Sequence, residues 1–307
     1  MTSDPLVSAL ARRAATLRSY LELARPWQWS KNAFVLVGLL FGHAWHDSAL
    51  ARAALLATLA FCLASAAAYA WNDAADAAQD RAHPGKARRP VARGAISPTG
   101  ARRFATGCAT VALGCAAAAG PGVALCLAGY LALSLVYTGL LKRFALLDVF
   151  AIAAGFMLRL LAGTAGIGIE PSPYLVACAL LLTLFLGFAK RRAELATLGV
   201  AGATHRRVLD AYRNGVLDAA VLVCAAGMLA VYTLYAVSEQ TAARHGTRGF
   251  VLTVPWVLFG TFRYLYRAYL RGGGGDPAEE LLRDPLLALA VAGWLATVLW
   301  LLAGSGA

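Results

Sequence analysis

Long apolar runs alternate with short polar segments along this chain, and most of the runs are about as long as a membrane-crossing helix. A helix needs about 20 apolar residues to cross the hydrocarbon core of a bilayer. Several runs are shorter than this, so the predicted ends of their helices are approximate. The pattern predicts an all-α, polytopic membrane protein with about nine transmembrane helices. The predicted spans cover residues 33–48, 50–71, 104–119, 121–141, 148–166, 173–189, 216–237, 250–268 and 286–304.

The composition agrees with a membrane protein. The 307 residues are 60% hydrophobic and 14% charged, with a mean hydropathy of +0.62. In a soluble domain, about a quarter of the residues are charged. Residues 1–24 are polar and basic and are interpreted as a cytoplasmic tail, and residues 25–305 as a single transmembrane domain. The first 31 residues lack the early apolar core of a cleavable signal peptide.

Basic residues are strongly biased to one side of the predicted topology. All but four of the 28 lysines and arginines lie before the first span, at span ends, or in the loops at 72–103, 142–147, 190–215 and 269–285. The positive-inside rule places these segments in the cytoplasm. The net charge of +12 follows largely from this bias, so no nucleic-acid partner is needed to explain it.

Three carboxylates follow the second span at helical spacing. At about 100° per residue, Asp76 and Asp80 lie about 60° and 20° from Asp73 around a helix axis, so the three share one face. Asn72 is close enough to add a carbonyl oxygen. Oxygen ligands of this kind suit Mg²⁺, and like charges on one face repel unless a cation lies between them. We therefore predict a metal site of Asn72, Asp73, Asp76 and Asp80 at a solvated helix end.

A basic cluster follows this acidic motif directly, with Lys86, Arg88 and Arg89 as candidates for binding phosphate groups. Together the two clusters indicate a metal-bound diphosphate handled at a membrane surface. Other chemistry-bearing residues on the same side are Lys142, Asp148, Lys190, Arg191, Glu194 and Tyr212. Asp148 opens the fifth span, so it is either an N-terminal cap or a further acid near the metal.

Arg159 lies deep inside the fifth span, where a charged side chain should face the protein interior or a polar cavity. It binds a phosphate there or anchors neighbouring helices. Near the first span, Trp27, Trp29 and Arg25 have the character of interfacial anchors.

With these motifs the chain resembles the UbiA superfamily of intramembrane prenyltransferases. The resemblance rests on the predicted spans together with Asn72-Asp73-x-x-Asp76-x-x-x-Asp80 after the second span. It implies a helical bundle around a central cavity that opens to the cytoplasmic face, with Mg²⁺ holding a diphosphate. Prenyl-diphosphate users usually carry a second acidic motif after the sixth span. Here that position is Lys190-Arg191-Arg192-Ala193-Glu194.

Strings along the whole chain are most similar to the decaprenyl-phosphate phosphoribosyltransferase branch of that superfamily. They include Arg25-Pro-Trp-Gln-Trp-Ser-Lys31, Tyr137-Thr-Gly-Leu-Leu-Lys142 and Gly155-Phe-Met-Leu-Arg159. The resemblance implies phosphoribosyl diphosphate as donor, a polyprenyl phosphate as acceptor, a bacterial inner-membrane location and a possible homotrimer. It implies a catalytic set of Asp73, Asp76, Asp80, Lys142 and Asp148. It also implies a substrate-binding set of Lys31, Asn72, Lys86, Arg88, Arg89, Tyr137, Arg159, Lys190, Arg191, Glu194 and Tyr212.

Two other functions stay open on the sequence. One is a prenyltransferase that uses a prenyl diphosphate and an aromatic or other small acceptor. The other is a transporter or lipid flippase, which would need polar groups on both sides of the membrane. The predicted outward loops carry few such groups, which disfavours transport.

Overall fold

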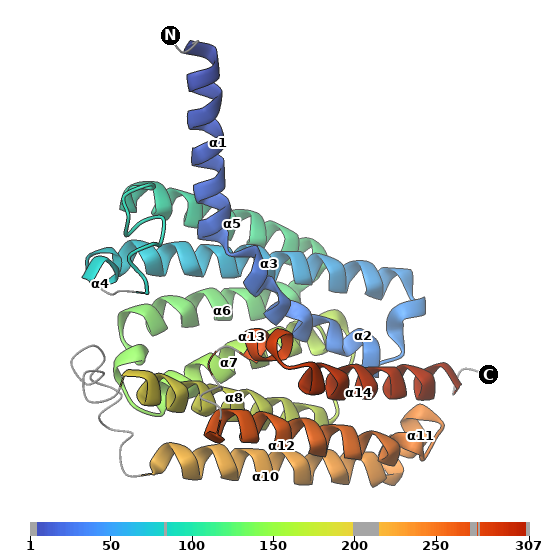
Figure 1. Ribbon diagram of the computed structural model, residues 1–307. Helices are drawn as coiled ribbons and strands as arrows, with labels where there is room; N and C mark the ends of the chain where they lie inside the picture. The colour runs from blue at the N-terminus through green and yellow to red at the C-terminus, as the bar shows by residue number, and fades with distance from the viewer. Residues whose placement is uncertain (1–4, 83–84, 199–214, 271–274, 276, 305–307) are drawn as a thin grey trace. The chain divides into compact units, whose positions relative to one another are not determined.

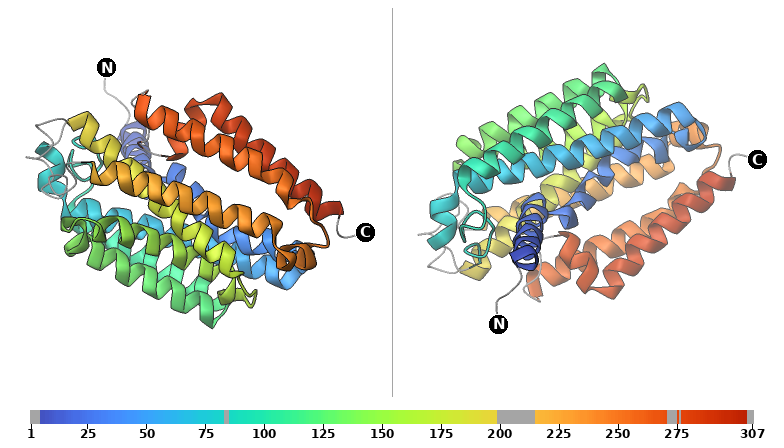
Figure 2. Two further views of the ribbon diagram at one scale, coloured as in Figure 1. Left: turned by 90° about the horizontal axis from the view of Figure 1, so that it is seen from below. Right: turned by 90° about the horizontal axis from the view of Figure 1, so that it is seen from above.

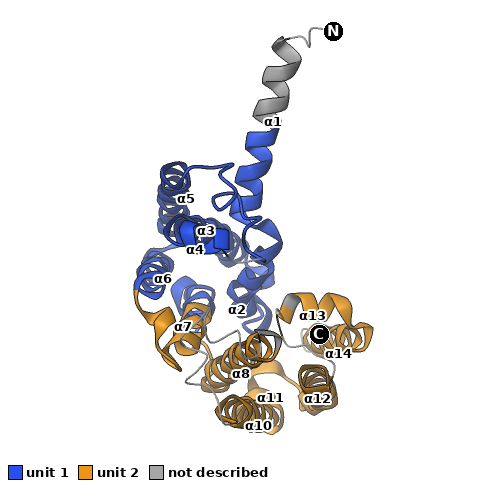
Figure 3. Cartoon of the chain, turned by 60° about the vertical axis from the view of Figure 1, so that its left-hand side comes forward, with its two compact units in different colours: residues 1–139, 158–170 blue, residues 140–157, 171–307 orange. Residues whose placement is uncertain are grey.

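The computed structural model describes residues 5–82, 85–198, 215–270, 275 and 277–304, and its regular elements in these ranges are helices (Figure 1). The chain divides into two compact units (Figure 3). Unit 1 comprises Met1–Gly139 and Leu158–Glu170, and unit 2 comprises Leu140–Met157 and Pro171–Ala307. Helix α7, Leu147–Ala162, contributes residues to both. We describe each unit by itself.

Among the described residues, six helical segments are long and apolar enough to cross a membrane, which confirms the all-α, multi-pass prediction. Each coincides with a predicted span. Their bounds as helices are Ser48–Ala75 (α3), Pro121–Gly139 (α6), Leu147–Ala162 (α7, extended by η4, Ala165–Ile167), Pro173–Leu198 (α8), Val216–Val237 (α10) and Pro285–Gly304 (α14).

The predicted span at 33–48 is wrong as a single helix. The chain there forms the 3-10 helix η1, Pro26–Leu36, the short helix α2, Val37–Phe41, and the 3-10 turn η2, Ala44–His46. The reason is a close backbone contact. A Cβ on Gly38 would overlap the carbonyl oxygen of Gly163, so this segment packs through glycine backbone against the turn between α7 and η4.

The third and eighth spans form helices that fall outside the six. Helix α5, Pro98–Ala119, begins with a polar, basic turn. Helix α12, Val254–Leu270, has 17 residues and carries Arg263 and Arg267. The predicted count of nine transmembrane helices is therefore not confirmed.

Unit 1 is built on the pairing of α3 with α5, which lie side by side in Figures 1 and 2. Small side chains allow two helices to approach closely, which is how helices associate in an apolar solvent. The alanines buried in the two helices include Ala54, Ala57, Ala60, Ala64, Ala101, Ala105, Ala112 and Ala116. Helix α1, Pro5–Ala24, and the short helix α4, Ala77–Ala82, pack near the motif-bearing end of α3.

Unit 2 pairs α8 with α10 and α12 with α14. Charged contacts tie α12 to α13, Pro277–Arg283, and to the start of α14. Arg263 and Arg267 each donate to the carboxylate of Asp284, at 2.8 and 3.0 Å. The Arg263 guanidinium and the backbone N–H of Leu287 hold the pKa of Asp284 well below its ordinary value, against the opposing effect of burial. The remaining elements are η3, Leu141–Arg143, α11, Glu239–His245, and η7, Gly249–Thr253.

Gly163 provides a test of the backbone contact in unit 1. A Cβ there would overlap the carbonyl oxygen of Val35, so Gly163→Ala should lower the free energy of unfolding by at least about 1–3 kcal/mol, the usual cost of overpacking. Thermal unfolding in detergent measures the effect. Gly114→Ala is the matched control, because a Cβ at Gly114 meets nothing within 4 Å. Equal melting temperatures for the two variants would contradict the packing described here.

Candidate active site

The acidic motif spans a break between two helices. Helix α3 ends at Ala75, Asp76 is its C-terminal cap with φ −97° and ψ 8°, and α4 begins at Ala77. The backbone bonds from Asp76 N to Asn72 O and from Asp80 N to Asp76 O, both 2.9 Å, continue the helical pattern across the break. The helix is thus interrupted at Asp76, while the helical hydrogen-bond pattern continues across the break to Asp80.

Asp73 is almost fully buried and is held by two arginines. Its side chain is 1% exposed. Nη2 of Arg25 lies 2.6 and 2.7 Å from the two carboxylate oxygens of Asp73, and Nη1 of Arg89 lies 3.1 Å from one of them. A buried carboxylate without such partners would be strongly unfavourable. The prediction of a solvated position for Asp73 is wrong, because the basic loop and the end of α1 cover it.

Arg89 also connects the two ends of the motif. The same Nη1 atom that contacts Asp73 donates to Asp80 at 2.7 Å, and Asp80 is itself buried. Two carboxylates, seven residues apart in sequence, thus converge on one cationic nitrogen. Asp76 is half-buried.

Arg25 reaches Asp73 from an unusual backbone position. It lies between α1 and η1 with φ 51° and ψ 58°, in the left-handed region, which costs a non-glycine residue about 1–2 kcal/mol. The following Pro26 disfavours the right-handed helical conformation at Arg25. Arg25, predicted as an interfacial anchor, pairs with the motif, and its side chain is 15% exposed. Trp27, in contrast, is 63% exposed.

These groups fit a divalent metal in their chemistry. Oxygen donors are the ligands that Mg²⁺ prefers, and Asp73 and Asp80 already direct oxygens at a shared cation. Within the described residues, however, no group of three or more histidines, cysteines, aspartates or glutamates is gathered as a metal site. The four-residue ligand set therefore stays a prediction, and forming it would require the side chains to rearrange.

The other predicted residues of unit 1 lie on several elements around the motif. The side-chain oxygen of Asn72 accepts a hydrogen bond of 3.4 Å from Thr138 of α6. Lys86 and Arg88 lie in the turns that connect α4 to α5, where Lys86 is half-buried and Arg88 is exposed. Lys31 of η1 and Tyr137 of α6 are half-buried.

Arg159 is buried within unit 1 and is bound by neutral groups from three segments. It donates to Asn32 of η1 at 2.7 Å, to Ser65 of α3 at 3.0 Å and to Tyr130 of α6 at 3.1 Å. Its guanidinium also lies 4.4 Å from the centre of the Tyr130 ring. These contacts are those of an anchor between segments, and a phosphate-binding role for Arg159 stays a prediction.

Unit 2 contains a second cation held between two carboxylates. Arg191 of α8 donates to Asp148 at 2.6 Å and to Glu194 at 2.7 Å. Asp148 is fully buried, and Arg191 is 3% exposed. Asp148 is the second residue of α7, not its cap, so the capping interpretation is wrong. Asp148 and Glu194 are thus both hydrogen-bonded to the Arg191 guanidinium.

Two further predicted cations, Lys142 of η3 and Lys190 of α8, are half-buried in unit 2. Beside them Arg192 donates to Asp218 at 2.6 Å, and its guanidinium lies 3.7 Å from the centre of the Tyr269 ring. Tyr212 lies outside the described residues.

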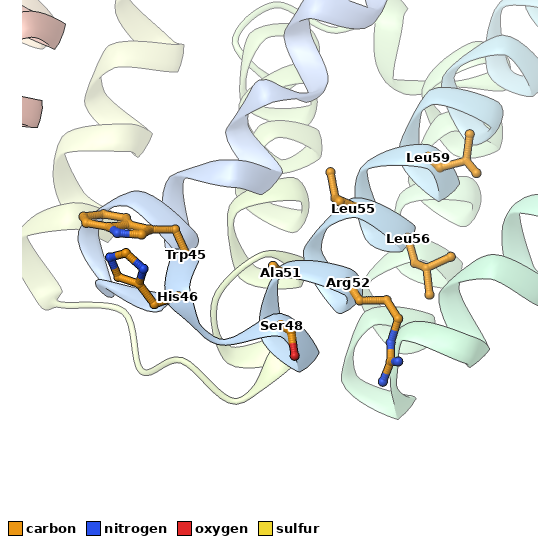
Figure 4. Close-up of a pocket in the computed structure, with 8 residues that line it drawn as sticks. All are labelled: Trp45, His46, Ser48, Ala51, Arg52, Leu55, Leu56 and Leu59. Atoms are coloured by element: carbon orange, nitrogen blue, oxygen red, sulfur yellow. The ribbon is translucent and has the colours of Figure 1, made fainter.

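A groove of about 600 Å³ lies along the first turns of α3 (Figure 4), and its lining residues Leu59 and Ser48 are about 21 and about 38 Å along the helix from Asp73. Its lining is mostly apolar, with three leucines on one face of α3. It contains one lysine or arginine and no carboxylate, so it is not the site of the metal chemistry. The lining residues are Trp45, His46, Ser48, Ala51, Arg52, Leu55, Leu56 and Leu59.

A model of the UbiA prenyltransferase family matches residues 32–270, which is most of the chain. The chain belongs to the UbiA prenyltransferase family. As a UbiA protein it is a multi-pass membrane transferase.

Two curated relatives of this UbiA protein carry the same description. It is 30% identical to "Decaprenyl-phosphate phosphoribosyltransferase" of Mycolicibacterium smegmatis, over 91% of this chain and 90% of the relative. It is 31% identical to the protein of that name from Corynebacterium glutamicum, over 90% of this chain and 84% of the relative.

The fold is also similar to that of a UbiA homologue from Archaeoglobus fulgidus solved with GPP and Mg²⁺. The TM-score is 0.70 at 19% identity, and the match covers 93% of this chain and 99% of the other.

The buried position of Asp73 predicts the effect of its substitution. Asp73→Asn removes the charge shared by Arg25 and Arg89, so it should lower the free energy of unfolding by about 3–5 kcal/mol as well as activity. Thermal unfolding of purified protein measures the loss of stability. Asp76→Asn, at a half-buried position, is the comparison and should unfold close to wild type. If Asp73→Asn unfolded at the wild-type temperature, the described burial and pairing would be contradicted.

Proposed function

We propose that this UbiA protein transfers a 5-phosphoribosyl group from phosphoribosyl diphosphate to a polyprenyl phosphate, with Mg²⁺, at the cytoplasmic face of a bacterial inner membrane. The observation that carries the proposal is the identity of about 30% to decaprenyl-phosphate phosphoribosyltransferases over about nine tenths of the chain. In the reaction, the bond between ribose C1 and the diphosphate breaks, and a bond from C1 to a phosphate oxygen of the lipid forms.

The arrangement of charge in unit 1 supports this chemistry. Asp73, Asp76 and Asp80, with the Asn72 carbonyl, would hold Mg²⁺. Bound there, the metal supplies positive charge to the departing diphosphate. Lys86, Arg88 and Arg89 would bind phosphate oxygens, arginine as a fork and lysine as a point charge. The lipid phosphate is ionised near neutral pH, so the protein's contribution is positioning and electrostatic stabilisation rather than proton removal.

Unit 2 has its own group of charged residues, Asp148, Arg191 and Glu194. Asp148 and Glu194 both accept hydrogen bonds from Arg191, which leaves one net negative charge on the three groups, and Lys142 and Lys190 are further cations of this unit. Phosphoribosyl diphosphate has a 5-phosphate in addition to its diphosphate, whereas a prenyl diphosphate has an apolar tail. Lys142, Lys190 and Arg191 are the proposed phosphate-binding residues of unit 2, with Asp148 and Glu194 holding Arg191 in position.

The competing function is transfer of a prenyl group to a small acceptor, which the family description favours. The lipid would then be the donor and not the acceptor. A transporter is not favoured by any contact described above.

Donor labelling separates the two transferase functions. Purified protein is given phosphoribosyl diphosphate labelled at the 5-phosphate, or at the β-phosphate, together with decaprenyl phosphate and Mg²⁺. We expect the 5-phosphate label in the lipid phase and the β-phosphate label in water-soluble diphosphate. Asp76→Asn should reduce this transfer at least about 100-fold if its carboxylate binds the metal. Arg93→Gln is the matched control, since Arg93 pairs with Glu22 away from the motif.

Incorporation only from a prenyl diphosphate, with none from either phosphoribosyl label, would overturn the proposed donor. Chelation of divalent metal by EDTA should stop transfer, and added Mg²⁺ should restore it.

A further inference from the structure

Arg89 has the contacts of a resident cation that competes with a metal ion. Its Nη1 atom lies at 3.1 Å from a carboxylate oxygen of Asp73 and 2.7 Å from one of Asp80. These are two of the carboxylates that the proposed function assigns to Mg²⁺. The side chain of Arg89 is 25% exposed, whereas those of Asp73 and Asp80 are 1% and 5% exposed. The arginine therefore covers the carboxylates from the solvent side.

The backbone around Arg89 is fixed, so only its side chain can move without disturbing the fold. Arg89 N donates to Lys86 O, and Arg93 N donates to Arg89 O, both at 2.9 Å. The following residues Pro90 and Val91 are buried. Rotation of a partly exposed arginine side chain could release both acids at once and leave the loop in place.

The charge balance decides what can take the place of Arg89. In the ion-paired group, Asp73 and Asp80 contribute two negative charges, and Arg25 and Arg89 contribute two positive ones; Asp76 is a further carboxylate of the motif. A divalent cation without a bound anion would meet two carboxylates whose charge is already balanced, and the two guanidiniums beside them would repel it. A metal bound to a diphosphate brings its own excess of negative charge, and the freed guanidinium can bind a phosphate oxygen.

We propose that Arg89 keeps divalent metal out of the Asp73–Asp80 pair until the metal arrives together with a diphosphate. The Arg89 guanidinium then moves to a phosphate oxygen and leaves both carboxylates to the metal. This inference rests on the proposed function for its metal and its diphosphate group. It goes further in assigning an order of binding and the residue that enforces it. Arg89 is a positioning residue in the free protein.

Metal binding in the absence of any ribosyl or prenyl donor tests the proposal. Full-length protein in detergent is dialysed to equilibrium against radiolabelled Mn²⁺, with and without radiolabelled inorganic pyrophosphate, and the excess of each on the protein side is measured. Wild type should retain Mn²⁺ and pyrophosphate together, and little Mn²⁺ alone. By reciprocal coupling, Mn²⁺ should tighten pyrophosphate binding by the same factor as pyrophosphate tightens Mn²⁺ binding.

Removal of the guanidinium should open the pair to metal alone. Arg89→Gln should bind Mn²⁺ without pyrophosphate at least about tenfold more tightly than wild type. Arg89→Lys keeps the charge and should behave like wild type. Arg93→Gln removes the same charge four residues away, from a guanidinium that contacts Glu22 and Ser19, and should also leave Mn²⁺ binding unchanged.

Two results would overturn the proposal. One is wild-type protein that binds Mn²⁺ alone as tightly as with pyrophosphate, which is decisive even if Arg89→Gln does not fold. The other is a folded Arg89→Gln whose Mn²⁺ affinity is no higher than that of Arg93→Gln. Neither binding measurement contains a ribosyl donor, so a wrong donor assignment does not change its result. Conversely, a negative result in the Mn²⁺ measurements does not contradict the donor assignment, which the labelling experiment tests.

Discussion

The pairing of the buried Asp73 carboxylate is the interaction on which the rest of unit 1 depends. A charge that is 1% exposed needs partners, and its partners come from distant parts of the chain. Arg25 lies 48 residues before it and Arg89 lies 16 residues after it. Through these contacts the end of α3, the junction between α1 and η1, and the loop before α5 are held together. The site is therefore also a structural joint of the unit.

The two units use a related device in different settings. In unit 1, Arg89 lies between Asp73 and Asp80 at the solvent side of the motif. In unit 2, Arg191 lies between Asp148 and Glu194 with its side chain 3% exposed. The more exposed guanidinium can exchange with a ligand, whereas release of the buried one would strand a charge in the interior. The two arginines therefore have similar carboxylate partners but differ in how readily they can be displaced by a ligand.

The membrane class and most of the helices could be predicted from the sequence, because hydropathy is a local property of 20-residue windows. The acidic motif and its basic neighbours could also be found, because their residues are close together in the sequence. The pairing of Arg25 with Asp73 could not, since nothing near Arg25 in sequence indicates a partner in α3. The apolar length of the span at 33–48 predicts one helix, whereas the close contact of Gly38 with Gly163 depends on a distant part of the chain, which the length of an apolar run does not indicate. Asn32, a polar residue next to an apolar run, was the available signal for the Arg159 contacts.

The alanine packing of α3 against α5 has a consequence for the arginine in the loop that precedes α5. Asp73 lies in α3, Asp80 lies in α4, and Arg89 belongs to the segment that leads into α5, so the separation of α3 and α5 bears on how far the guanidinium must extend. At the buried alanines each helix presents only a methyl group as its side chain, which permits a short separation of the two helices. Side-chain volume in the middle of α3 and α5 therefore influences how far a cation near their ends must reach.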